Sequence, residues 1–165
     1  MGWQAMSPRI EFVLLSSLLA SVLATLGYLC SPGDAGSGFS EESFRFALSF
    51  ILPAAASAAL GAFYAAASHS HTRKLRMRWT PARLNMHAVL ATLAIYPLAV
   101  GMGWAILQLT SETHASSIND VGYVLMIGFF LGFFATAAGV IPTFILEYFA
   151  CRRYLRRMAA ITGHA

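Results

Sequence analysis

The amino-acid sequence predicts an all-α integral membrane protein, in which four transmembrane helices pack as a bundle within a single membrane domain covering residues 1–165. Charged residues make up 11% of the chain and hydrophobic residues 58%, whereas soluble domains carry about 25% charged residues. Four long stretches contain no Asp, Glu, Lys or Arg: 12–33, 46–72, 84–111 and 121–146. Each is long enough to cross about 30 Å of hydrocarbon, which takes roughly 20 helical residues.

The four helices are expected at about 12–30, 46–68, 85–109 and 121–150. A helix satisfies its own backbone hydrogen bonds where no water is present, and the other structure that can do so is a closed β-barrel. Barrel strands alternate in hydrophobicity over about ten residues, and the apolar run 52–67 shows no such alternation. A cleaved signal peptide is the alternative for the first span. The length of this span and Glu11 just before it favour a retained helix.

Ten of the eleven basic residues flank the spans on one side, which predicts the orientation of the chain. The middle connection 69–84 and the C-terminal tail carry nine of the eleven cations, and Arg9 is a tenth. The connections 31–45 and 110–120 contain acids and few cations. Because cytoplasmic loops are enriched in Lys and Arg, we expect both termini and the middle loop in the cytoplasm. The protein is expected in the inner membrane of a bacterium, with the two short connections in the periplasm.

The same basic residues bear on the partners of the protein. Because they flank apolar runs, they favour a lipid bilayer as the partner, and nucleic acid is not expected. The residues expected to contact anionic lipid headgroups are Arg73, Lys74, Arg76, Arg78, Arg152, Arg153, Arg156 and Arg157. Membrane orientation by itself also accounts for these cations without a lipid ligand.

Small residues mark the faces expected to pack closely, because helices in lipid associate through close backbone approach. The fourth span has a stripe of them at steps of four, three and four: Gly128, Gly132, Ala135 and Gly139. Gly61 in the second span and Gly101 in the third belong to similar stripes. Packing within one chain is the favoured interpretation, and an interface with a partner or in a homo-oligomer is the alternative.

Three prolines lie inside the predicted spans: Pro53, Pro97 and Pro142. Each removes a backbone donor and is expected to bend its helix, either to shape the bundle or as a gating hinge. Pro53 and Pro142 lie at opposite ends of their spans, so the inverted repeat typical of secondary transporters is missing.

Three histidines are expected near the cytoplasmic face: His69 and His71 at the end of the second span and His87 at the start of the third. Imidazole rings on facing helices can hold a metal ion or haem. Interfacial histidines that bind water or headgroups are the commoner case, and no cofactor is predicted.

Other polar residues offer little chemistry. The central part of each span holds no ionisable residue, which disfavours proton-coupled transport. Glu147 is expected at the inner interface beside Arg152 and Arg153, in a solvated or lipid-headgroup pairing. Cys30 and Cys151 are expected at opposite membrane faces, too far apart for a disulfide. The GxSxG, HExxH and Walker motifs are absent from the sequence, so an enzyme is not expected.

A compact four-span protein of this kind has mainly its helix surfaces and short loops with which to act. We therefore expect a non-enzymatic accessory or immunity-type protein that binds another membrane-inserted protein, such as a membrane-acting toxin. The layout is similar to that of the immunity proteins that protect cells from pore-forming bacteriocins, and the likeness is one of architecture without a shared motif. A small channel or transporter subunit and a haem- or metal-binding bundle are the alternatives.

Overall fold

The computed structural model describes residues 6–30, 41–74, 79–110 and 118–162. It contains four helices: α1 (Pro8–Leu29), α2 (Glu41–Lys74), α3 (Pro81–Thr110) and α4 (Ile118–Thr162). These residues include no β-strand. Each of the four helices is long and apolar enough to cross a membrane, which confirms the predicted all-α class and the number of helices that could span a bilayer.

The helices run past the ends of the predicted spans. α2 ends at Lys74 and α3 begins at Pro81, so most of the predicted loop 69–84 is helical. α4 continues to Thr162, well beyond the predicted end near residue 150. The difference arises because the absence of charge marks the thickness of the hydrocarbon layer, whereas backbone hydrogen bonds can continue into water.

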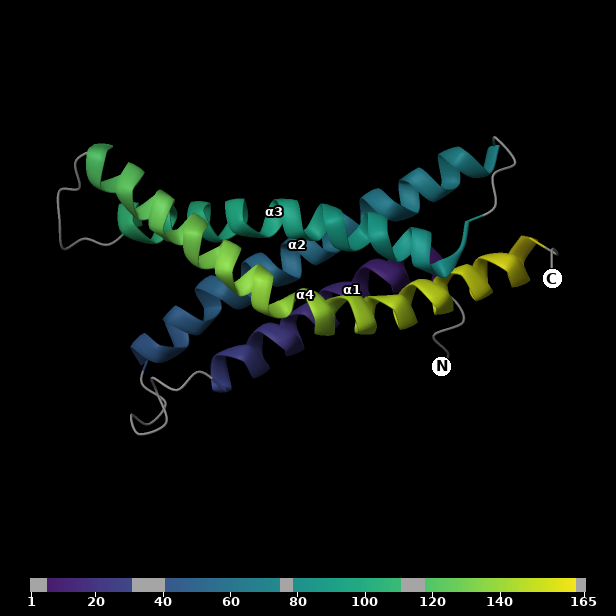
Figure 1. Cartoon of the computed structure of the whole chain (residues 1–165), viewed down its shortest axis with the longest axis horizontal. Coiled ribbons are helices and arrows are strands. Elements are labelled where there is room, and N and C mark those ends of the chain that lie inside the picture. Colours follow the sequence, from purple (N-terminus) through teal and green to yellow (C-terminus); the bar gives the residue numbers. More distant parts are fainter. Residues whose placement is uncertain (1–5, 31–40, 75–78, 111–117, 163–165) are drawn as a thin grey trace.

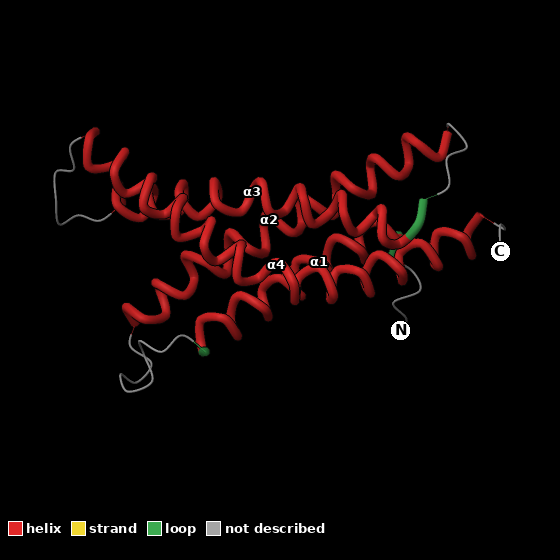
Figure 2. Tube along the Cα trace, viewed as in Figure 1, coloured by secondary structure: helices red, strands yellow, loops and turns green. Residues whose placement is uncertain are grey.

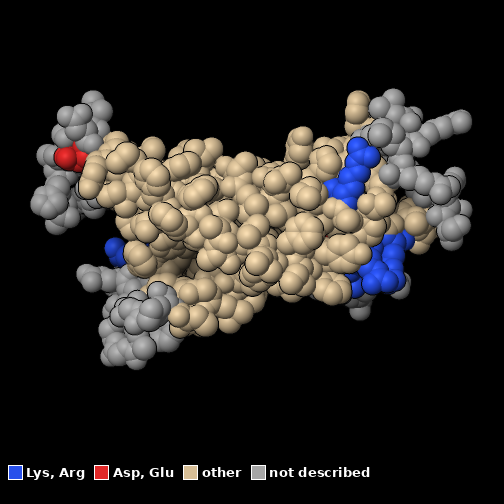
Figure 3. All heavy atoms as spheres, in the orientation of Figure 1, with Lys and Arg blue, Asp and Glu red and all other residues tan. Residues whose placement is uncertain are grey.

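Each helix packs against the next one along the chain, and α4 also packs against α1, so the helices form a closed ring of neighbours. The start of α1, the end of α2, the start of α3 and the end of α4 lie at one end of the molecule (Figure 1). Figure 2 shows that helix makes up nearly all of the described trace. Lys and Arg gather at this same end (Figure 3). We call it the basic end, and its exposed cations are Arg9, Arg83, Arg152, Arg153 and Arg156.

α4 changes direction near its middle (Figure 1), and Pro142 lies inside this helix. A bend is expected there, because proline lacks a backbone donor and its ring crowds the preceding turn. Before the bend, Gly132 lies against α3. After the bend, Tyr154 stacks on Phe12 of α1 with ring centroids 5.0 Å apart. The bend thus allows the first half of α4 to pack against α3 and the second half to pack against α1.

The close approach of the helices depends on glycine. A Cβ added at Gly132 would lie 2.9 Å from the Cα of Pro97, and one added at Gly128 would lie 3.0 Å from the Cα of Gly101. A Cβ at Gly61 of α2 would lie 2.7 Å from a backbone carbonyl oxygen of α3. These positions therefore serve packing between helices of the same chain.

The rest of the predicted stripe on α4 is not packed in this way. Ala135 is exposed. A Cβ added at Gly139 would meet, among the described residues, only the side chain of Thr143 on the same helix, at 3.9 Å. The stripe is therefore divided into a half that α3 covers and a half that no described helix covers closely.

A core of buried side chains lies toward the basic end and draws on all four helices. Its buried members are Phe12, Ala62, Ala65, Ala66, Leu84, Ala88, Ala150, Cys151 and Tyr154. Large apolar side chains elsewhere face outward, and Phe63, Leu98 and Phe134 are each more than half exposed. Soluble proteins rarely expose apolar surface on this scale, so the outer surface of the bundle is suited to lipid.

Candidate functional site

Glu147 lies inside the bundle, which corrects the expectation of a solvated residue beside Arg152 and Arg153. It is 6% exposed, and the hydroxyl of Ser16 on α1 donates a hydrogen bond of 2.6 Å to its Oε1. The two arginines are exposed on other faces of α4. The expectation was wrong because it considered closeness along the chain and not the direction of each side chain.

The spacing of buried residues on α4 explains this position. Glu147, Ala150, Cys151 and Tyr154 are all buried, and they follow the i, i+3, i+4, i+7 spacing of a single helix face. Ser16 is buried on the facing side of α1, one turn from Phe12. The same periodicity is present in the sequence, and it is the signal that separates Glu147 from its arginine neighbours.

Glu147 also lies deeper than the charged residues of the basic end. Arg153 follows six positions after Glu147, which corresponds to about 9 Å along a helix that rises roughly 1.5 Å per residue. It directly follows the uncharged stretch 121–146 of α4 and is buried among the helices, so it is an ionisable group at the end of a candidate membrane span that lies toward the basic end. Such residues are costly in hydrocarbon and commonly mark functional sites.

A small cavity adjoins Glu147 and receives side chains from all four helices. Its lining comprises Ser16, Leu19, Ala20, Leu23, Ala58, Val89, Thr92, Thr143, Leu146 and Glu147. The space in which the centre of a water molecule could lie is about 10 Å³. This is close to the space that one buried water molecule needs. Polar groups reach the cavity from α1, α3 and α4, whereas α2 contributes an alanine.

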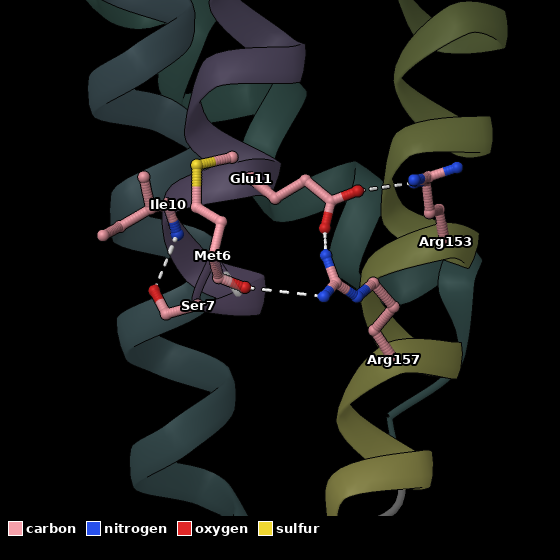
Figure 4. Close-up of polar contacts among 6 residues, drawn as sticks. All are labelled: Met6, Ser7, Ile10, Glu11, Arg153 and Arg157. Atoms are coloured by element: carbon pink, nitrogen blue, oxygen red, sulfur yellow. Dashed lines mark hydrogen bonds and ion pairs between the residues drawn. The ribbon is translucent and has the colours of Figure 1, made fainter. Parts of the chain in front are cut away.

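A second buried acid joins α1 to α4 nearer the basic end (Figure 4). Glu11 is 5% exposed, and its Oε1 accepts a hydrogen bond of 2.7 Å from Nε of Arg153. Its other carboxylate oxygen forms an ion pair with Arg157. Arg157 also donates to the carbonyl oxygen of Met6 at 3.5 Å, so the segment leading into α1 is held against α4.

These contacts alter the set of residues expected to meet lipid headgroups. Arg153 and Arg157 contact Glu11, although the Arg153 side chain remains 60% exposed. Arg152 and Arg156 are also exposed. Arg76 and Arg78 lie outside the described residues, as do the side chains of Arg73 and Lys74.

The predicted histidine group does not assemble around a common centre. His69 is buried, and its Nδ1 lies 3.4 Å from the hydroxyl of Tyr154. Nδ1 of His87 donates to the carbonyl oxygen of Arg83 at 2.8 Å. The Trp79 ring packs against both imidazoles, with ring centroids 5.8 Å and 4.9 Å apart. His71 is exposed. Within the described part of the chain, no group of three His, Cys, Asp or Glu residues could hold a metal ion.

Asn85 is a further buried polar residue that the sequence analysis missed. It is fully buried on α3, and its Nδ2 donates to the carbonyl oxygen of Phe144 on α4 at 2.9 Å. Its Oδ1 has no hydrogen-bond partner among the described residues. Asn85 therefore links α3 to α4 just beyond the proline bend.

The two cysteines lie as predicted at different ends of the bundle. Cys30 follows the end of α1 and is exposed, whereas Cys151 is buried in α4 toward the basic end. Both are free thiols.

Comparisons of this chain with protein families, with curated proteins and with solved structures found no match.

Proposed function

We propose that this chain is a protein of the bacterial inner membrane that acts by binding another membrane-inserted protein, as an accessory or immunity-type protein. The observation that carries the proposal is the divided stripe on α4. Gly128 and Gly132 are covered by α3, whereas Ala135 is exposed and Gly139 meets little beyond its own helix. Small residues allow the backbone of another helix to approach closely.

The surroundings of the uncovered half of the stripe support a helical partner. Phe130, Phe133 and Phe134 are exposed on the neighbouring faces of α4. Small residues bordered by large aromatic ones form a surface with hollows and ridges, into which a second helix can pack by van der Waals contact. The partner that this surface suits is therefore a transmembrane helix of another protein.

The orientation proposed for the protein follows from charge. The basic end carries nearly all of the described cations (Figure 3), and Arg45 near the start of α2 is the exception. Lys and Arg are retained on the cytoplasmic side during insertion. We place the basic end, with both termini, in the cytoplasm.

The experiment that tests this function is protection from a pore-forming toxin encoded beside the gene for this chain. Co-expression is expected to keep cells alive, and wild-type protein that gives no protection contradicts the immunity-type function. Ala135→Leu is expected to abolish protection at unchanged membrane levels, because a larger side chain blocks the approach of the partner helix. Ala137→Leu is the matched control, since Ala137 is also exposed and lies on nearly the opposite face of α4.

A small channel or transporter is a second candidate, favoured by the buried Glu147 beside a cavity that all four helices line. The centres of the spans still hold no ionisable residue, which disfavours proton-coupled transport, but Glu147 provides a buried acid nearer the basic end. Solute flux in proteoliposomes separates this candidate from the first.

A further inference from the structure

Among the described residues, the lining of the cavity beside Glu147 offers this acid hydroxyl groups but no positive charge. Ser16 donates to the carboxyl, and Thr92 and Thr143 also line the cavity. The hydroxyl of Thr92 donates to the carbonyl oxygen of Ala88 at 2.9 Å, which leaves its oxygen lone pairs able to accept a hydrogen bond from water. The remaining lining residues are apolar.

The ionisable groups near Glu147 do not neutralise a carboxylate there. On α4 the next such group along the same face is the thiol of Cys151, and on α1 it is Glu11, which is itself an acid. The lining residues from α2 and α3 are Ala58, Val89 and Thr92. Arg153 and Arg157, the cations that reach the interface between α1 and α4, contact Glu11 instead.

A carboxylate without a cationic partner is strongly disfavoured away from water, and such a group takes up a proton instead. A protonated carboxyl keeps an oxygen that accepts from Ser16 and gains an O–H that can donate to water. The cavity has room for about one water molecule. The polar groups around it provide the two to four partners that a buried water requires.

We propose that Glu147 is a proton-binding site inside the membrane, which exchanges its proton with a water molecule in the adjoining cavity, and that Ser16 positions its carboxyl. On release, the carboxyl O–H bond breaks and the proton bonds to the water oxygen, which leaves a carboxylate and a hydronium ion. Uptake is the reverse, and no electron is transferred. This inference rests on the geometry around Glu147 and is independent of the proposed binding of a protein partner.

The test is labelling of the full-length protein in native membrane vesicles with dicyclohexylcarbodiimide, an apolar reagent that reacts with protonated carboxyl groups. Mass spectrometry is expected to find the adduct on Glu147. Labelling is expected to fall about tenfold for each pH unit once the carboxyl ionises. Glu11 provides a control within the same molecule, because its ion pairs hold it as a carboxylate that the reagent does not modify.

Two variants sharpen the test. Glu147→Gln is expected to lose the label completely while keeping an oxygen that accepts from Ser16. Ser16→Ala is expected to increase labelling at a fixed pH, because a hydrogen bond that favours the charged carboxylate is removed. If Glu147→Gln fails to accumulate, the pH dependence of labelling at Glu147, compared with Glu11 in the same wild-type protein, still tests the proposal.

Three results overturn the proposal. They are the absence of label on Glu147 in folded protein, labelling that does not change with pH, and protection of Glu147 by sodium ions at constant pH. The last result would make the cavity a metal-cation site and not a proton site.

Discussion

Glu11 and Glu147 are both buried acids at the contact between α1 and α4, yet their surroundings differ. Glu11 has two arginine partners from α4, whereas Glu147 accepts from a serine hydroxyl. Opposite charges and charge-assisted hydrogen bonds offset the cost of removing a carboxylate from water. At the scale of single residues, Glu11 therefore stabilises the fold as an anion, while Glu147 occupies a site suited to the neutral acid.

The ion pairs of Glu11 lead to a prediction about stability. Arg157→Gln is expected to lower the free energy of unfolding by about 1–3 kcal/mol. Breaking a fully buried ion pair by removing one partner costs roughly 3–5 kcal/mol. The expected loss is smaller here because the Arg157 side chain is 25% exposed and Arg153 still contacts Glu11. Thermal or denaturant unfolding in detergent micelles measures the change.

The neighbouring Arg156 provides the control for this measurement. It is exposed, so Arg156→Gln is expected to change the unfolding free energy by no more than about 0.5 kcal/mol. Combining Glu11→Gln with Arg157→Gln is expected to cost less than the sum of the single changes, since both remove one interaction. Strict additivity would show that the pair contributes nothing.

At the scale of helices, the position of α4 is set by glycine before the bend and by polar contacts after it. Gly128 and Gly132 bring its first half against α3. Beyond Pro142, its second half is linked to α3 by Asn85 and to α1 by Ser16. In lipid there is no hydrophobic drive between helices, so close packing and interhelical hydrogen bonds together determine where the helix lies.

The glycine contacts lead to a prediction at this scale. Gly132→Ala is expected to lower the free energy of unfolding by about 1–3 kcal/mol, since the added methyl group would overlap the backbone of α3. Gly122→Ala on the same helix is the control, because a Cβ there meets nothing within 4 Å among the described residues. It is expected to leave stability unchanged or to raise it by up to about 1 kcal/mol, since alanine is the better helix former. Equal losses in both variants would contradict the packing role of Gly132.

At the scale of the whole molecule, the polar groups of the bundle are concentrated in its basic half. The ion pairs of Glu11, the cavity of Glu147 and the cluster of His69, Trp79 and His87 all lie there. In the opposite half, aromatic rings do much of the packing, and Phe46 and Phe50 contact the ring of Trp104. The proposed proton site is therefore closer to the proposed cytoplasmic face.

The two natural cysteines allow the orientation to be tested. With Cys151→Ala, the remaining Cys30 is expected to react with a membrane-impermeant maleimide in cells whose outer membrane alone is opened. In a variant without natural cysteines, Arg156→Cys is expected to react only after the inner membrane is opened as well. The reverse pattern would place the basic end in the periplasm and would contradict the proposed orientation.

Much of the architecture was predictable from the sequence alone. The four uncharged stretches identify the spans, because the thickness of the hydrocarbon layer sets the minimum length of a helix that crosses it. The sequence predicted the stripe of small residues on α4, but it did not predict which of them α3 covers. Gly128, Gly132, Ala135 and Gly139 share one face of an ideal helix, yet the bent α4 meets α3 closely at the first two alone.

Charge spacing by itself therefore determined the number of helices and their approximate limits. Tertiary structure decided which polar residues are buried, because a side chain changes direction by about 100° with each residue of a helix. Glu147 and Arg152 are near neighbours in the sequence, but one faces Ser16 on α1 and the other is exposed. The physical reason is that insertion into a membrane depends on the hydrophobicity of a whole segment, whereas burial depends on which neighbouring helix each face meets.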